Sequence, residues 1–148
     1  MSFIKFINST YENGPALENV YNYILNRGKC VMSGCHNVLM DMAVPMMYET
    51  RKFFGVTSGR VLMHIVISPS RSEKVEIRQF CNMISFIATS FRNHQVVYAV
   101  HGSGKLLHAH LMVNAVNFRN GEVANDLTPF KNEIAQMCEI FYPNTTIE

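Results

Sequence analysis

The sequence predicts an α+β fold, in which a central antiparallel β-sheet of about five strands is covered by helices. Short runs rich in β-branched and aromatic residues alternate along the chain with stretches whose apolar residues recur at helical spacing. A glycine-rich turn at Gly102 and Gly104 connects two of the strand-like runs directly. Such a short connection is typical of an antiparallel hairpin.

The expected strands are bounded by turn residues such as Pro, Gly, Asn and Ser. They are assigned to residues 2–8, 30–33, 60–68, 95–100 and 106–118. The run at 60–68, RVLMHIVIS, has apolar residues on both faces, which is typical of a strand inside a sheet. His64 lies in its middle, where a lone histidine is usually a hydrogen-bonded structural residue.

The expected helices keep their apolar residues on one face. They are assigned to residues 16–26, 44–54, 74–91 and 128–141. Gly28 and Gly55 follow the first two, a common place for glycine after a helix. Thr128 is the expected N-cap of the last helix. In the first helix Tyr21 lies on the apolar face and Tyr23 lies off it, so Tyr23 is either an ordinary surface tyrosine or a nucleophile.

Length and composition indicate one globular domain over residues 1–148. The chain is 48% hydrophobic and 16% charged, which excludes a disordered protein. Its net charge of +2 is too small to indicate nucleic-acid binding by itself. The N-terminus lacks a positive region followed by a long apolar run, so no secretory signal is expected, and no run approaches the length of a membrane span. We therefore expect a cytoplasmic protein with no membrane segment.

The cysteines are scattered and lack the paired spacing of a zinc ribbon. In a cytoplasmic protein they are expected to be reduced thiols. The close spacing of Cys30, Cys35 and His36 leaves a small metal cluster open as an alternative.

The sharpest chemical signal is the segment HGSGKLLHAHLMVN at residues 101–114. Residues two apart in a strand share a face, so His108 and His110 stand side by side. His101, across the tight turn, is a candidate third ligand. Three neutral imidazoles suit a divalent metal ion and leave coordination positions open for catalysis. The alternative is a set of exposed histidines at a sheet edge.

Three blocks of the sequence, in order, resemble the motifs of conjugative relaxases, which are mobilisation nucleases of the HUH endonuclease superfamily. VYNYILNRGKC at residues 20–30 is similar to the tyrosine motif of that family. SGCHNV at residues 33–38 and YETRKFFGVTSGRVLMHIVISPS at residues 48–70 resemble the middle block, with His64 and Ser68 in the matching positions. His101, the His-Ala-His run ending at His110, and Asn114 resemble the histidine motif. The resemblance covers roughly residues 17–121.

The resemblance implies a site and a reaction. Tyr23 would be the nucleophile, and the metal ligands would be His101, His108 and His110. Supporting roles would fall to His64, Ser68 and Asn114. The tyrosine would cut single-stranded DNA at an origin of transfer, leaving a 5′-phosphotyrosyl link and a free 3′-hydroxyl, and the reverse reaction would rejoin the strand. The metal would be Mn, Mg, Zn or Ni.

The implied partners are single-stranded DNA and accessory proteins of the relaxosome. Candidate DNA contacts near the motifs are Arg27, Lys29 and Lys105, since cationic side chains bind the DNA backbone. For each of them a solvated surface charge is the alternative.

Two positions depart from the family pattern. Ser103 stands where the family often has an acidic residue, and Leu106 where it often has another histidine. The Ser103 departure fits an alternative, a DNA-binding or regulatory relative with weakened activity. Two further alternatives stay open: a rolling-circle replication initiator or transposase, and a metal-dependent hydrolase that uses water. Relaxases are commonly longer, so the chain is either a minimal protein or the N-terminal part of a longer one.

Overall fold

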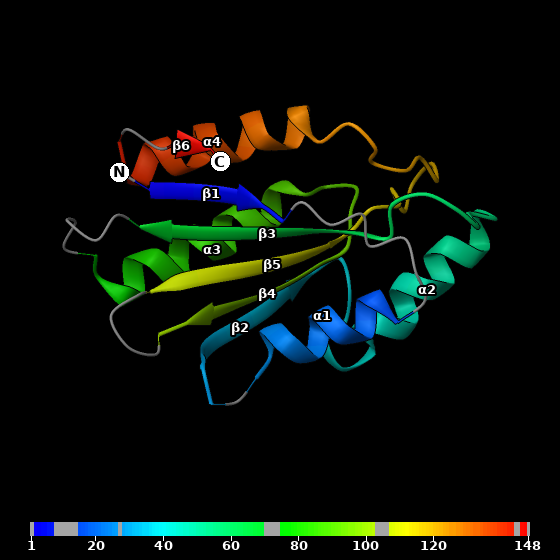
Figure 1. Cartoon of the computed structure of the whole chain (residues 1–148), viewed down its shortest axis with the longest axis horizontal. Helices are drawn as coiled ribbons and strands as arrows, with labels where there is room; N and C mark the ends of the chain where they lie inside the picture. The colour runs from blue at the N-terminus through cyan, green and yellow to red at the C-terminus, as the bar shows by residue number, and fades with distance from the viewer. Residues whose placement is uncertain are drawn as a thin grey trace.

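The computed structural model describes residues 2–7, 15–26, 28–69, 75–102, 107–143 and 146–147. These residues form a six-stranded sheet in the order β2-β4-β5-β3-β1-β6, with helices on both faces (Figure 1). The strands are β1 (Ser2–Phe6), β2 (Cys30–His36), β3 (Leu62–Pro69), β4 (Val96–His101), β5 (His108–Asn114) and β6 (Thr146–Ile147). The helices are α1 (Ala16–Ile24), the short 3₁₀ helix η1 (Met40–Met42), α2 (Ala43–Phe53), α3 (Ile77–Ser90) and α4 (Thr128–Phe141).

The predicted α+β fold with an antiparallel sheet is confirmed. β1, β3, β5, β4 and β2 pair antiparallel, and β4 and β5 form the expected hairpin. The sequence did not indicate β6, a two-residue strand that pairs parallel with β1. β3 lies between β5 and β1, which confirms that the run at 60–68 forms a strand inside the sheet.

Some predicted boundaries were wrong. β2 continues to His36, because its backbone pairs with β4 as far as Val96. β5 ends at Asn114 rather than at residue 118, because the Asn114 side chain there accepts a hydrogen bond from the Val116 backbone N–H (3.2 Å). Thr128 is the first residue of α4 and not its N-cap. Its backbone N–H is bound instead by the Asp126 carboxylate (3.0 Å).

A glycine follows the C-terminus of each of α1 and α2 in the sequence, but only the one after α2 ends its helix. α2 ends at Phe53, and Gly55 follows with a φ of 66°, a left-handed conformation that glycine adopts without strain. α1, in contrast, already ends at Ile24, before the predicted boundary. The Leu25 N–H closes the last turn on the Tyr21 carbonyl (3.1 Å), so Gly28 does not end this helix.

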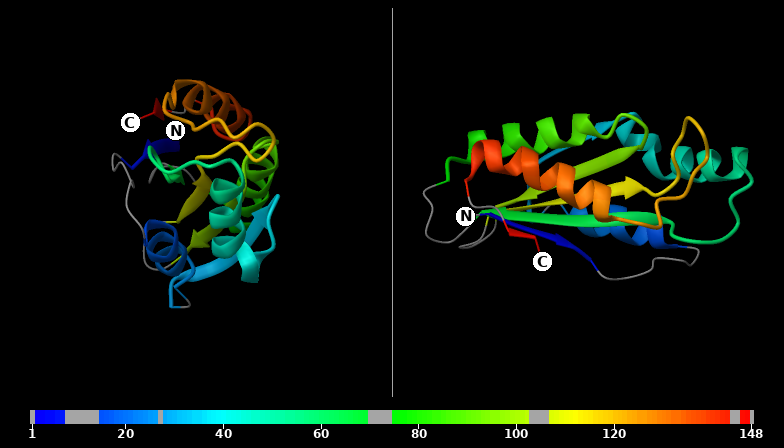
Figure 2. Two further views of the ribbon diagram at one scale, coloured as in Figure 1. Left: turned by 90° about the vertical axis from the view of Figure 1, so that its right-hand side faces the viewer. Right: turned by 90° about the horizontal axis from the view of Figure 1, so that it is seen from above.

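Helices pack on the two faces of the sheet in separate layers (Figure 2). α3 and α4 cover one face, where the core includes Phe80, Ile84, Ile65, Leu111 and Tyr98. α1 packs on the other face and α2 lies next to α1 at one end of the sheet (Figure 1), and the core there includes Leu17, Ile24, Met47, Leu62 and Met112. Since alternate strand residues point to opposite faces, the even-numbered residues of β3 and β5 face α1 and α2. None of the described helices is both long and apolar enough to cross a membrane.

Candidate active site

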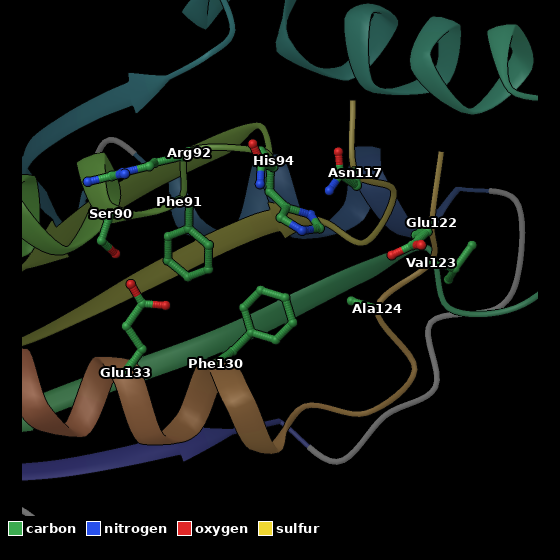
Figure 3. Close-up of a pocket in the computed structure, with 11 residues that line it drawn as sticks. Ser90, Phe91, Arg92, His94, Asn117, Glu122, Val123, Ala124, Phe130 and Glu133 are labelled. Carbon is green, nitrogen blue, oxygen red and sulfur yellow. The ribbon is translucent and has the colours of Figure 1, made fainter. Parts of the chain in front are cut away.

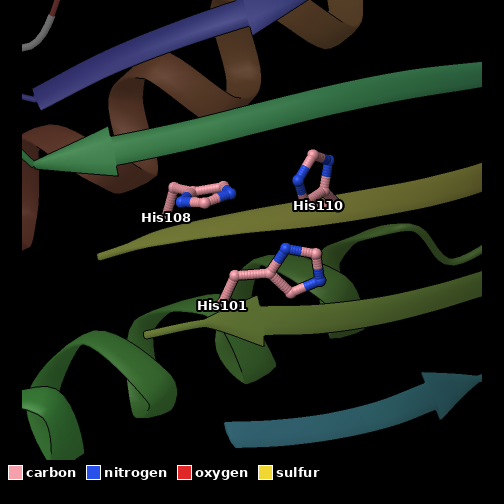
Figure 4. A group of neighbouring side chains, drawn as sticks. All are labelled: His101, His108 and His110. Carbon is pink, nitrogen blue, oxygen red and sulfur yellow. The ribbon is translucent and has the colours of Figure 1, made fainter. Parts of the chain in front are cut away.

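Strand register brings the histidines together on the face covered by α1. His101 of β4 pairs directly with His108 of β5. His110 lies between Ala99 of β4 and Val66 of β3. The three imidazoles therefore come from two neighbouring strands, and their rings gather over one patch of the sheet (Figure 4).

The spacing of the three rings is suited to a single ion. One ring nitrogen of each histidine lies within 4.8 Å of the other two. Ring centroids are 4.7 Å apart for His101 and His110, 5.0 Å for His108 and His110, and 5.1 Å for His101 and His108. Histidine nitrogens bind zinc at about 2.0–2.1 Å, so three nitrogens this close to one another are a candidate ligand set.

This triad is the one such group of histidine, cysteine and carboxylate side chains among the described residues. The alternative cluster of Cys30, Cys35 and His36 is not formed there. Those residues lie on the edge strand β2, and both cysteines are free thiols.

Hydrogen bonds to the other ring nitrogens fit a metal site. The Nε2–H of His101 donates to the carbonyl oxygen of Ile24 (2.7 Å), which leaves Nδ1 available. His110 uses Nδ1 to bond the Nε2 of His64 (2.8 Å), while its own Nε2 is buried with no hydrogen-bond partner. An unpaired buried polar atom costs about 1–3 kcal/mol, and a metal ion would satisfy this one. Histidine ligands commonly bond a carbonyl or another side chain through their second nitrogen.

Burial favours the neutral form of the imidazoles of His64 and His110. A histidine must be neutral to bind a metal ion. Burial lowers the pKa of His64 to about 4. Burial also lowers the pKa of His110 to about 3, and the neighbouring His64, His101 and His108 push it in the same direction because a second positive charge there would be repelled. The donor set contains no carboxylate, so a bound divalent ion would keep its full positive charge.

Tyr23 lies beside this group, in the last turn of α1. Its ring centroid is 5.4 Å from that of His110 and 6.4 Å from that of His64, with the rings edge to face. The side chain is 56% exposed, so a ligand in solvent can reach it. Tyr21 behaves differently. It is half-buried, its hydroxyl donates to the Met40 carbonyl (3.0 Å), and burial raises its pKa. Helical spacing could not assign a role to Tyr23, whereas its docked position puts it at the histidines.

The residues that the resemblance implied as supporting fall in different places. His64 contacts one member of the triad, His110, through a hydrogen bond between their rings. Ser68 is half-buried on β3, one residue beyond the Ile67–Ala109 pair and on the face of the histidines. Asn114 is fully buried and lies four residues along β5 from His110, a rise of about 13 Å. The structure therefore does not group Asn114 with the triad.

Asn114 instead connects three elements at the far end of β5. Its side-chain amide donates to the Gln95 side-chain oxygen (2.9 Å) and to the Met47 carbonyl (3.4 Å). Through these bonds it holds β5 against the start of β4 and against α2.

Of the candidate DNA contacts, only Lys29 lies within the described residues. Arg27 and Lys105 fall outside them, as do Ser103 and Leu106, the two departures from the family pattern. Lys29 is exposed just before β2, and its carbonyl oxygen accepts a hydrogen bond from the N–H of Gly102 (3.3 Å). The backbone of Lys29 is therefore next to Gly102, the residue that follows His101.

Sequence analysis missed two features of the site. Lys5 is exposed on β1 and pairs with Val66, which in turn pairs with His110, so it shares the histidine face. The alternation of buried Ile4 and Phe6 around Lys5 was a signal that could have found it. No sequence signal indicated that the carbonyl of Ile24 would bond His101.

A hollow of about 680 Å³ lies near the end of β4 that is opposite His101 (Figure 3). Buried His94 lines it and contacts the edge of Phe130, with ring centroids 5.3 Å apart. The Nδ1–H of His94 donates to the Asn114 carbonyl oxygen (2.9 Å). None of the triad residues lines this hollow, so His94 is a buried histidine outside the candidate active site.

The fold and the site together define an α+β domain in which three histidines that could hold a metal ion lie beside an exposed phenol. A family model, described as the MobA/VirD2-like nuclease domain of relaxases, matches residues 23–141. This chain belongs to that family and is a relaxase nuclease domain. The matched residues begin at Tyr23 and include His64 and the whole triad.

Two further comparisons complete the picture. A solved structure from a study of the molecular basis of vancomycin resistance transfer in Staphylococcus aureus is similar to this chain with a TM-score of 0.47 and 14% identity. The alignment covers 81% of this chain and 75% of the other. No curated protein matches the sequence.

Proposed function

We propose that this chain nicks and rejoins single-stranded DNA at an origin of transfer during conjugation, with Tyr23 as the nucleophile. The observation that carries the proposal is the edge-to-face contact of Tyr23 with His110, at 5.4 Å between ring centroids. It puts a solvent-accessible phenol next to three imidazoles that can share an ion. Membership of the relaxase family supports the same reaction.

The proposed reaction exchanges one phosphodiester for another. The Tyr23 hydroxyl oxygen attacks the phosphorus and loses its proton, and the bond from phosphorus to the 3′-oxygen breaks. That oxygen takes up a proton and leaves as a 3′-hydroxyl, while the 5′ end stays on the protein as a phosphotyrosyl ester. Because both esters are of similar energy, the 3′-hydroxyl can reverse the step and rejoin the strand without an external energy source.

Different residues of the chain would contribute to different parts of this reaction. A divalent ion on His101, His108 and His110 would offset negative charge on the non-bridging phosphate oxygens. The end of α1 holds Tyr23 over the same patch of the sheet. Lys5, on the histidine face of the sheet, and Lys29, just before β2, are exposed and are proposed to bind the DNA backbone. Accessory relaxosome proteins are proposed as further partners.

The test uses a pool of random-sequence single-stranded oligonucleotides with manganese. A label on the 3′ end is expected to become covalently attached to the protein, whereas a label on the 5′ end is released on a shorter strand. Tyr23→Phe is expected to abolish the adduct. Tyr21→Phe, two residues away in the same helix, is the matched control and should keep it.

Other outcomes select the alternatives. Cleavage by Tyr23→Phe without any adduct would indicate a hydrolase that uses water as the nucleophile. If the wild-type protein binds the oligonucleotides and yields neither adduct nor cleavage, the chain is a DNA-binding relative and the enzymatic proposal fails.

A further inference from the structure

The hydrogen bond between His64 and His110 limits which ring nitrogen of each histidine can carry a proton. The Nε2 of His64 and the Nδ1 of His110 are 2.8 Å apart, and both side chains are at least nine-tenths buried. Between two neutral imidazoles at this distance, one N–H must donate to the lone pair of the other ring. Either His110 donates to His64, or His64 donates to His110.

The two arrangements differ at the far side of the His110 ring. If His64 donated, the proton of His110 would sit on Nε2, which is buried and has no acceptor. A buried donor without an acceptor lowers stability, and a protonated nitrogen cannot bind a metal. If His110 donates, its Nε2 keeps a lone pair. Both considerations favour the second arrangement.

We propose that His64 is a positioning residue: it accepts the Nδ1–H of His110 and thereby fixes the tautomer in which Nε2 of His110 is the metal ligand. This inference rests on the metal site of the proposed function. His64 itself does not belong to the triad whose nitrogens lie within 4.8 Å of one another, so its role is exerted through His110.

His101 offers an internal comparison. There the carbonyl of Ile24 accepts the Nε2–H, which leaves Nδ1 as the ligand atom. The two ligands are thus held in opposite tautomers by acceptors from different elements, α1 for His101 and β3 for His110. At His110 the acceptor is a neutral imidazole rather than a carboxylate, so fixing the tautomer adds no negative charge beside the ion.

The first arm of the test needs no metal. Long-range proton–nitrogen correlation spectra of histidine-labelled, metal-free protein near neutral pH report the tautomer of each ring. His110 is expected to carry its proton on Nδ1 in the wild type. His64→Gln keeps an acceptor oxygen and should preserve this tautomer, whereas His64→Leu should shift His110 toward the Nε2–H form. A wild-type His110 protonated on Nε2, or a tautomer unchanged in His64→Leu, would overturn the inference.

The second arm measures zinc binding by calorimetry. His64→Leu is expected to weaken the affinity by about 10–100-fold, and His64→Gln by distinctly less. His94→Leu is the matched control, because His94 is equally buried but lies outside the site, and its affinity should equal that of the wild type. Wild-type protein that binds no zinc would refute the metal site, while the spectra still decide the tautomer. Equal zinc affinity of the wild type and His64→Leu would refute the role of His64 alone.

Discussion

The imidazole Nε2 of His101 lies 2.7 Å from the carbonyl oxygen of Ile24, at the last residue of α1. The final carbonyls of a helix have no N–H partner within the helix, so an outside donor is stabilising there. Since Tyr23 directly precedes Ile24, this one bond connects the proposed nucleophile to the strand that carries a proposed metal ligand. The position of α1 and the geometry of the triad are therefore coupled.

This coupling predicts that His101→Leu lowers stability as well as metal binding. The variant leaves the Ile24 carbonyl without its donor, and the expected loss is about 1–3 kcal/mol in the free energy of unfolding, measured with urea on metal-free protein. His108→Leu, at a half-buried position of the same triad, is expected to lose less. Equal losses for the two variants would contradict the proposed anchoring of α1.

Lys29 is expected to contribute to DNA binding through charge. Neutralising one phosphate contact to single-stranded DNA changes the slope of log K against log salt by about 0.7. Lys29→Gln should therefore bind a labelled oligothymidine more weakly at low salt and show a shallower slope, as measured by fluorescence anisotropy. Arg78→Gln, at an exposed position of α3 on the other side of the sheet, is the control. A slope that changes as much in the control would show that Lys29 acts only through net charge.

Buried histidines predict acid sensitivity of the metal-free protein. The folded-state pKa of His64 is about 4 and that of His110 about 3, whereas an unfolded histidine has a pKa of about 6.5. As the pH falls below about 6.5, the unfolded chain takes up protons that the folded protein refuses, so the stability present above that pH is lost toward pH 4. For His64 the slope is at most about 1.4 kcal/mol per pH unit.

Urea unfolding near pH 7 and near pH 5 checks this expectation. Stability should fall toward the lower pH, and His64→Gln should show a smaller fall because one buried imidazole has been removed. An identical pH dependence of the variant and the wild type would mean that His64 does not resist protonation in the folded protein.

Gly34 is expected to tolerate no side chain. A Cβ at this position of β2 would overlap the ring and hydroxyl of Tyr98, which is buried and hydrogen-bonded to Ser85 (3.2 Å). Gly34→Ala should lower the free energy of unfolding by about 1–3 kcal/mol, because Tyr98 must move within a packed core. Ser33→Ala, on the neighbouring exposed position, should change it little. A melting temperature equal to that of the wild type would contradict this packing.

Much of the fold could be predicted because its signals are local. Helical spacing located α2 and α4, and the two-residue period of a strand put His108 and His110 on one face. Boundaries were less predictable. β2 continues to His36 only because β4 offers backbone partners, and β5 ends at Asn114 where a side-chain hydrogen bond bends the chain. Such limits depend on neighbours that are distant in sequence.

The sequence by itself determined the α+β class, the presence of the histidine triad, and the position of Tyr23 off the apolar face of its helix. Only the tertiary structure decided that α1 docks its last turn on the triad, that His64 bonds His110, and that Asn114 lies apart from both. The physical reason is that periodicity reports which way a side chain points from its own element. Which side chains then meet is set by strand register and helix docking between distant residues, such as His101 and Ile24, which are 77 positions apart.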